Sequence, residues 1–132
     1  MKRVRAFLVA FVVMIASVLV MVSPAHACSW LIAQTVTLYA GSNSIGSVRL
    51  FVDGCGNAQG QLHDIVVDAN QEIDIYSSTH TYSSYVRYGN YGASSNPVHV
   101  GNAQVAAAGY VYGNSGSGSF FWYGNTGYHG AY

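Results

Sequence analysis

The sequence predicts an all-β fold, a small antiparallel sandwich or barrel of about eight short strands with one disulfide, preceded by a signal peptide. No segment after Cys28 keeps a helical periodicity, whereas short runs that alternate apolar and polar residues recur. Glycine and asparagine separate these runs, as turns do in a domain of short strands. The chain has only two cysteines, Cys28 and Cys55.

Residues 1–27 have the features of a secretory signal peptide. Three cations, Lys2, Arg3 and Arg5, precede an apolar run over residues 6–22, and residues 25–27 read Ala-His-Ala, a small-x-small cleavage site. An uncleaved membrane anchor is the alternative, and Pro24 and the cleavage site argue against it. We therefore expect a secreted, extracellular β domain over residues 28–132.

Cys28 has two possible fates, a lipid or a disulfide. A bacterial lipobox needs a branched apolar residue three positions before the cysteine, where this chain has Ala25, and His26 also fits poorly. An even cysteine count in a small secreted chain favours pairing. We expect a bridge between Cys28 and Cys55, with lipidation of Cys28 as the alternative.

The expected strands follow one another at close spacing. They cover residues 34–40, 45–54, 61–67, 72–78 and 80–89, with turns at 41–44 and 68–71. A hairpin is expected from 96–100, a turn at Gly101-Asn102 and 104–113, and a last strand over 115–124. Alternation places Val48, Leu50 and Val52 on one buried face, and Ile73 and Ile75 on another.

The stretch from Cys28 to Cys55 resembles a family of small secreted proteins of Gram-positive bacteria that is catalogued as a domain of unknown function. The similarity lies in a cysteine near the mature N-terminus, a Gly-x-Val-x-Leu strand (Gly46, Val48, Leu50) and the second cysteine. The chain departs from the family where a tryptophan and an arginine usually follow the second cysteine, since residues 58–61 read Ala-Gln-Gly-Gln. The resemblance implies a secreted, uncharacterized β domain with one bridge, and it implies no activity.

The charge of residues 28–132 excludes some partners. Two arginines, Arg49 and Arg87, stand against five acidic side chains, a net charge of −3 with neutral histidines. Two cations cannot neutralise many phosphates or an anionic membrane. We therefore expect no nucleic-acid partner and no membrane contact after signal cleavage. The oligomeric state is not predicted.

No catalytic motif or cofactor site is expected. The segment 113–117, Gly-Asn-Ser-Gly-Ser, narrowly misses a nucleophile elbow, and Gly54 to Gly60 is one residue too long for a dinucleotide loop. His63-Asp64 could position a general base, but no nucleophile is marked. We therefore expect no enzyme and no cofactor.

Four acidic residues near one expected turn form a candidate calcium site, because Ca²⁺ prefers several oxygen ligands. These are Asp64, Asp68, Glu72 and Asp74. The favoured interpretation is a solvated face that keeps a lysine-free domain soluble.

Tyrosines dominate the second half of the chain. All eleven lie after Cys28, among serine, asparagine and glycine, a composition that suits adaptable recognition. The candidate binding residues are Tyr82, Tyr85, Tyr88, Tyr91, Tyr112, Trp122 and Tyr123. The expected partner is a cell-wall glycan or another cell-surface component; the alternative is that half of these rings fill the core.

The leading hypothesis is therefore a secreted, non-catalytic binding or cell-surface module. A small antimicrobial or toxin-like protein is the alternative, and a hydrolytic enzyme comes third.

Overall fold

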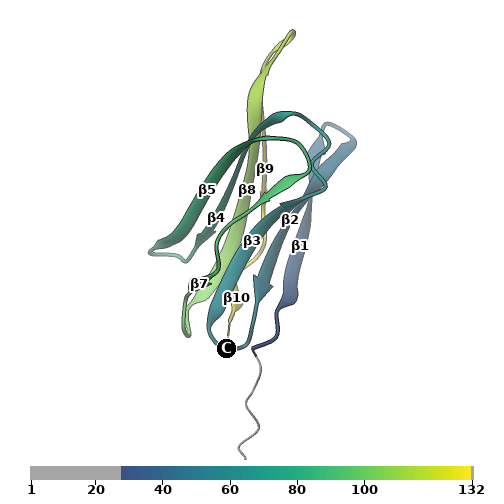
Figure 1. The fold of residues 1–132 in the computed structure, drawn as a ribbon. Coiled ribbons are helices and arrows are strands. Elements are labelled where there is room, and N and C mark those ends of the chain that lie inside the picture. The colour runs from purple at the N-terminus through teal and green to yellow at the C-terminus, as the bar shows by residue number, and fades with distance from the viewer. Residues whose placement is uncertain (1–27, 132) are drawn as a thin grey trace, which may run out of the picture.

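A computed structural model describes residues 28–131, and these form two β-sheets packed face to face (Figure 1). There is no helix in this range, so the predicted all-β class is confirmed. The ten strands are β1 (Leu31–Ala40), β2 (Asn43–Val52), β3 (Asn57–His63), β4 (Ala69–Tyr76), β5 (Thr81–Gly89), β6 (Gly92–Ser94), β7 (Val98–His99), β8 (Gln104–Ser115), β9 (Gly118–Asn125) and β10 (His129–Gly130).

Each sheet contains five antiparallel strands. Sheet A has the order β1-β2-β3, and both β6 and β7 pair with the far edge of β3. Sheet B has the order β5-β4-β8, and both β9 and β10 pair with the other edge of β8. Four of the nine pairs of consecutive strands are hydrogen-bonded to each other: β1–β2, β2–β3, β4–β5 and β8–β9. The chain crosses between the two sheets three times, from β3 to β4, from β5 to β6 and from β7 to β8.

The core between the sheets is aliphatic. Val48, Leu50, Ile73 and Ile75 are fully buried, and Val52 is 4% exposed, as the alternation predicted. No phenylalanine, tyrosine or tryptophan in residues 28–131 is among the buried side chains. Tyr82, Phe120 and Trp122 pack against the core only at its margin, so the aromatic rings are left at the periphery and on the surface.

Glycines let the two sheets approach closely. A Cβ atom on Gly109 of β8 would lie 2.6 Å from Leu62 Cδ2 and from Val48 Cγ2 in sheet A. A Cβ on Gly124 of β9 would lie 2.6 Å from Leu38 Cδ2, and one on Gly60 of β3 would lie 2.8 Å from Ile73 Cγ1. Large aliphatic side chains on one sheet therefore fill the space that glycines leave on the other.

One turn, residues 53–57, connects distant parts of the chain, and we call it the Cys55 turn. Cys55 forms the predicted disulfide with Cys28, with Cα atoms 5.6 Å apart. The Gly56 N–H donates to Ala131 O at 2.6 Å, and Gly56 O accepts from Val100 N at 2.7 Å. Gly56 has a φ of +81°, a conformation that favours glycine.

Asp53 stabilises the Cys55 turn from within. Its carboxylate accepts hydrogen bonds from Cys55 N at 2.8 Å and from Asn57 N at 3.0 Å, and Asn57 Nδ2 donates to its second oxygen. Burial opposes ionisation of this carboxyl, but the hydrogen bonds from Asn57 and Cys55 prevail and lower its pKa below the usual value. The turn is thus ordered around a charged carboxylate.

Two expected boundaries were wrong in the third and fourth strands. The third strand begins at Asn57 and ends at His63, so residues 65–67 lie outside it, and of these Ile65 is buried. The expected turn at 68–71 is mostly strand, since β4 begins at Ala69 and Gln71 is fully buried. Asp64, with a φ of +54°, makes the turn instead.

The expected hairpin around Gly101-Asn102 was also wrong. A turn is present there, but β7 pairs with β3 in sheet A, whereas β8 belongs to sheet B. Residues 115–124 are not the last strand, because the short β10 follows. The sequence pattern shows that a turn exists, but it does not show whether the strands on either side of the turn pair with each other.

The signal peptide prediction falls on residues 1–27, which lie outside the described residues. In residues 28–131 there is no helix of the length and apolar character that crossing a membrane requires.

The close approach of the sheets can be tested at Gly109. We expect Gly109→Ala to lower the free energy of unfolding by about 1–3 kcal/mol, because the added methyl group must displace Leu62 and Val48. Gly116→Ala is the control, since nothing lies within 4 Å of a Cβ there. Urea unfolding of both variants measures the difference; equal effects would contradict this account of the packing.

The disulfide can be tested by reduction. The bridge closes a loop of 27 positions, and we expect dithiothreitol or Cys55→Ala to lower the free energy of unfolding by about 2–4 kcal/mol. Thiol titration of the native protein should find no free thiol. A melting curve that is the same with and without reductant would show that the bridge does not stabilise the fold.

Candidate functional site

The outer face of sheet B carries six aromatic side chains from four strands. Side chains alternate along each strand, so the register brings one ring from each of several strands into the same row. Tyr88, Asn70, Tyr112 and Phe121 form one such row across β5, β4, β8 and β9. The next row contains Val86, Glu72, Tyr110 and Tyr123.

We call the six rings on this surface the tyrosine face: Tyr76, Tyr88, Tyr110, Tyr112, Phe121 and Tyr123.

The rings of β8 and β9 contact one another. The centroids of Tyr110 and Tyr123 are 5.2 Å apart, those of Tyr110 and Phe121 are 6.0 Å apart, and both pairs are tilted by 41–47°. Such offset pairs are favourable and limit the motion of each ring. Phe121 is nevertheless 62% exposed and Tyr123 is 50% exposed. The rings are therefore ordered by their neighbours and still available to a ligand.

Two carboxylates lie among these rings. Glu72 and Asp74 are two residues apart on β4, so both project from the outer face beside Tyr110. Neither has an ion-pair partner in residues 28–131, and the buried oxygen Asp74 Oδ1 accepts no hydrogen bond there. Hydrogen-bond donors of a ligand can reach only the carboxylate oxygens that are not buried, which excludes Asp74 Oδ1.

Asn125 orders one end of the tyrosine face. Its side-chain nitrogen donates to Tyr123 Oη at 2.7 Å and also to Tyr76 Oη. Tyr76 in turn makes an edge contact with Tyr128, with centroids 5.9 Å apart. Below these side chains, Ala106 and Ala108 on the same face of β8 are buried. This end of the face is therefore packed, whereas the Phe121 end is open.

The surroundings of two phenols disfavour their ionised form. Burial raises the pKa of Tyr110, and the negative charges of Asp74 and Glu72 raise it further. Burial also raises the pKa of Tyr76, and the hydrogen bond from Asn125 opposes this effect only in part. Both phenols therefore remain neutral hydrogen-bonding groups over the whole ordinary pH range.

The structure brings together some of the predicted binding residues and separates others. Tyr88, Tyr112 and Tyr123 belong to the tyrosine face. Tyr85 is on the opposite side of β5, opposite Ile73, and Trp122 stacks on Phe120 on the inner side of β9 with centroids 4.5 Å apart. Tyr82 packs at the margin of the core, and Tyr91 is in the turn before β6.

The four acidic residues of the candidate calcium site do not gather around one turn. Glu72 and Asp74 share the tyrosine face, whereas Asp68 precedes β4 and Asp64 pairs with His63 beside sheet A. Within residues 28–131, no three His, Cys, Asp or Glu side chains are grouped so that they could hold a metal ion.

The sequence-based selection left out Tyr76, Tyr110 and Phe121. Alternation on β8 and β9 was a usable signal for two of them, because Tyr110 is two residues from Tyr112 and Phe121 is two residues from Tyr123. Tyr76 follows Glu72 and Asp74 at the same spacing on β4.

Comparisons of the chain with protein-family models, with curated proteins and with solved structures find no match. The resemblance to the secreted Gram-positive proteins stays a prediction.

The raised pKa values can be tested by following tyrosinate absorbance as the pH increases. We expect Tyr110→Phe to remove one phenol that ionises above the ordinary value of 10.0, and Asp74→Asn to shift that ionisation to lower pH. The unfolded chain ionises more readily than the folded one, so the stability linked to Tyr76 and Tyr110 is present below pH 10 and is lost as pH rises through their folded pKa values. If all tyrosines titrate together in the native protein, as they should in denaturant, the burial argument is wrong.

Proposed function

We propose that the protein is an extracellular, non-catalytic binding module, and that its tyrosine face binds a glycan of the cell surface. The observation that carries this proposal is the set of ordered rings on the outer face of sheet B, with Phe121 and Tyr123 half-exposed or more. The aliphatic core has no need of these rings, so their packing role does not account for their number on this face.

A glycan fits the chemistry of the face. The electron-rich face of an aromatic ring attracts the weakly positive C–H groups of a sugar ring, and the neighbouring rows of sheet B present several rings to successive sugars. The hydroxyl groups of the sugar can donate to Glu72 and to the side chain of Asn70, which lie in the two rows of rings, and to Asp74 in the row beside them. Unpaired carboxylates repel phosphates, so a neutral or amino-bearing glycan suits this surface better than an anionic polymer.

An extracellular location agrees with the disulfide, because such bridges persist in oxidising compartments. The signal sequence features of residues 1–27 support export. An antimicrobial role or hydrolysis has no comparable observation in its favour.

Retention on insoluble polysaccharides tests the proposal. Wild-type protein is expected to bind at least one of cellulose, chitin or purified cell wall, and Phe121→Ala or Tyr123→Ala should each weaken binding about three- to tenfold, the loss expected for one stacking contact. Tyr39→Ala is the matched control, since Tyr39 is 58% exposed on β1 in the other sheet.

Two outcomes would contradict the proposal. One is that the protein is retained on none of the three materials, even when each offers binding sites at millimolar concentration. The other is an equal loss in Tyr39→Ala, which would show that exposed tyrosines bind without regard to the face.

A further inference from the structure

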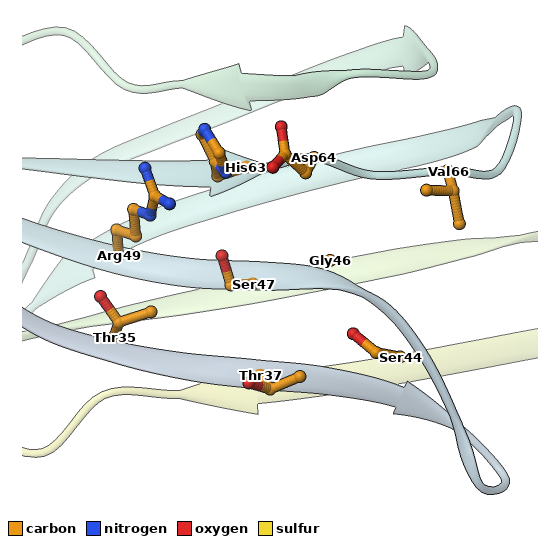
Figure 2. A pocket seen from close by; sticks show the side chains of 9 residues that line it. All are labelled: Thr35, Thr37, Ser44, Gly46, Ser47, Arg49, His63, Asp64 and Val66. Carbon is orange, nitrogen blue, oxygen red and sulfur yellow. Dashed lines mark ion pairs between the residues drawn. The ribbon is translucent and has the colours of Figure 1, made fainter.

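The outer face of sheet A has a different chemistry from the tyrosine face. A shallow hollow of about 410 Å³ lies over β1, β2 and the end of β3. Its polar lining includes Thr35, Thr37, Ser47, Arg49, His63 and Asp64, which Figure 2 shows on adjacent strands. Hydroxyl groups and one guanidinium take the place of the aromatic rings found on sheet B.

The backbone of β2 shapes this hollow at Gly46. Gly46 has a φ of +141°, and a Cβ there would lie 2.5 Å from Ile65 Cδ1 and 2.8 Å from His63 O. The segment after β3 therefore folds against the start of β2, and Val66 N donates to Ile45 O at 3.2 Å. This crossing forms one wall of the hollow and places Asp64 and Val66 at its rim.

Arg49 is in the middle of the sheet, with Thr35 opposite it on β1 and Gln61 opposite it on β3. Its Nε is buried and donates to no group, and its guanidinium makes no ion pair with any residue in the described range 28–131. Because no carboxylate of the described residues neutralises this guanidinium, its accessible nitrogens can donate to an anionic ligand. Arg49 and Arg87 are the two cations of this range, so the placement of one of them here is unusual.

Hydroxyl groups surround the guanidinium. Register places Thr37 opposite Ser47, and Ser47 opposite His63, so these side chains form the row next to that of Arg49. The hydroxyls of Thr35, Thr37 and Ser47 have no hydrogen-bond partner among residues 28–131. They are therefore free to donate to a ligand that Arg49 attracts.

The acidic residue of the hollow is already paired. His63 Nδ1 lies 3.1 Å from Asp64 Oδ2, and the Asp64 side chain is 78% exposed at the rim. Asp64 thus leaves Arg49 unneutralised, but its charge disfavours a ligand with two negative charges. The hollow suits a singly charged group.

We propose that this hollow binds a carboxylate, with Arg49 as the charged anchor and the hydroxyls of Thr35 and Ser47 as neighbouring donors. The planar guanidinium matches a carboxylate through two parallel N–H···O bonds. Such a carboxylate can belong to an acidic sugar or to the end of a peptide, and the hollow recognises the group they share. This site is on the face opposite the tyrosine face and does not depend on the glycan proposal.

Titration of the disulfide-bonded protein, followed by NMR, tests the proposal with three probes. Methyl glucuronoside presents a sugar carboxylate, N-acetyl-alanine presents a peptide carboxylate, and methyl glucoside is the uncharged control. We expect one or both acids to shift the resonances of Ser47, Arg49 and His63, and methyl glucoside to bind at least about tenfold more weakly. The acid that binds more tightly identifies the source of the carboxylate.

Variants then assign the binding to Arg49. Arg49→Gln should weaken the tighter acid about tenfold or more, and Arg49→Lys should recover only part of the loss because it restores the charge without the planar pair of donors. Arg87→Gln removes the other arginine, which lies on β5 of sheet B, and this variant should bind as wild type does. Ser47→Ala provides a milder second variant should Arg49→Gln fail to fold.

Three results would overturn the proposal. They are no shift with either acid, equal affinity for methyl glucoside, and binding by a folded Arg49→Gln variant that equals that of wild type. Equal weakening in Arg87→Gln would also overturn it, because the effect would then come from net charge alone.

Discussion

The close contact between the two sheets is the constraint on which the rest of the structure depends. Gly60, Gly109 and Gly124 leave space that isoleucine, leucine and valine of the facing sheet occupy. The gap is therefore filled by aliphatic side chains, and no aromatic ring in the described residues is buried there. The rings lie instead at the margin of this core or on an outer face. The chemistry of the surface is thus a consequence of how the interior is packed.

The sequence predicted those parts of the fold that follow from the alternation of buried and exposed side chains along a strand. Val48, Leu50, Ile73 and Ile75 were recognised as buried because each alternates with polar neighbours, and the cysteine count was enough to predict the bridge. Strand pairing could not be predicted in the same way: β7 is close to β8 in sequence, yet it pairs with β3. Pairing depends on long-range contacts that leave no local pattern.

The candidate binding surface was predicted only in part for a related reason. Alternation shows which residues of one strand share a face, but in a strand with apolar residues on both sides it does not show which face is buried. Tyr85 and Tyr88 on β5 illustrate this, since both are tyrosines and they project to opposite sides. The hollow around Arg49 had no sequence signature, because its side chains come from three strands and are brought together by register alone.

The Cys55 turn has a consequence for how the domain can be attached to other molecules. Cys28 is bonded to this turn by the disulfide, and Ala131 is bonded to it through the N–H of Gly56. Both ends of the described chain therefore meet at one pole of the sandwich, opposite the tip of the β8–β9 hairpin, as Figure 1 shows. A fluorescent protein or a surface anchor fused at either end would leave both outer faces open. The same proximity makes circular permutation feasible, with a short linker across that pole and new ends at the exposed residues 116–118 of the hairpin tip.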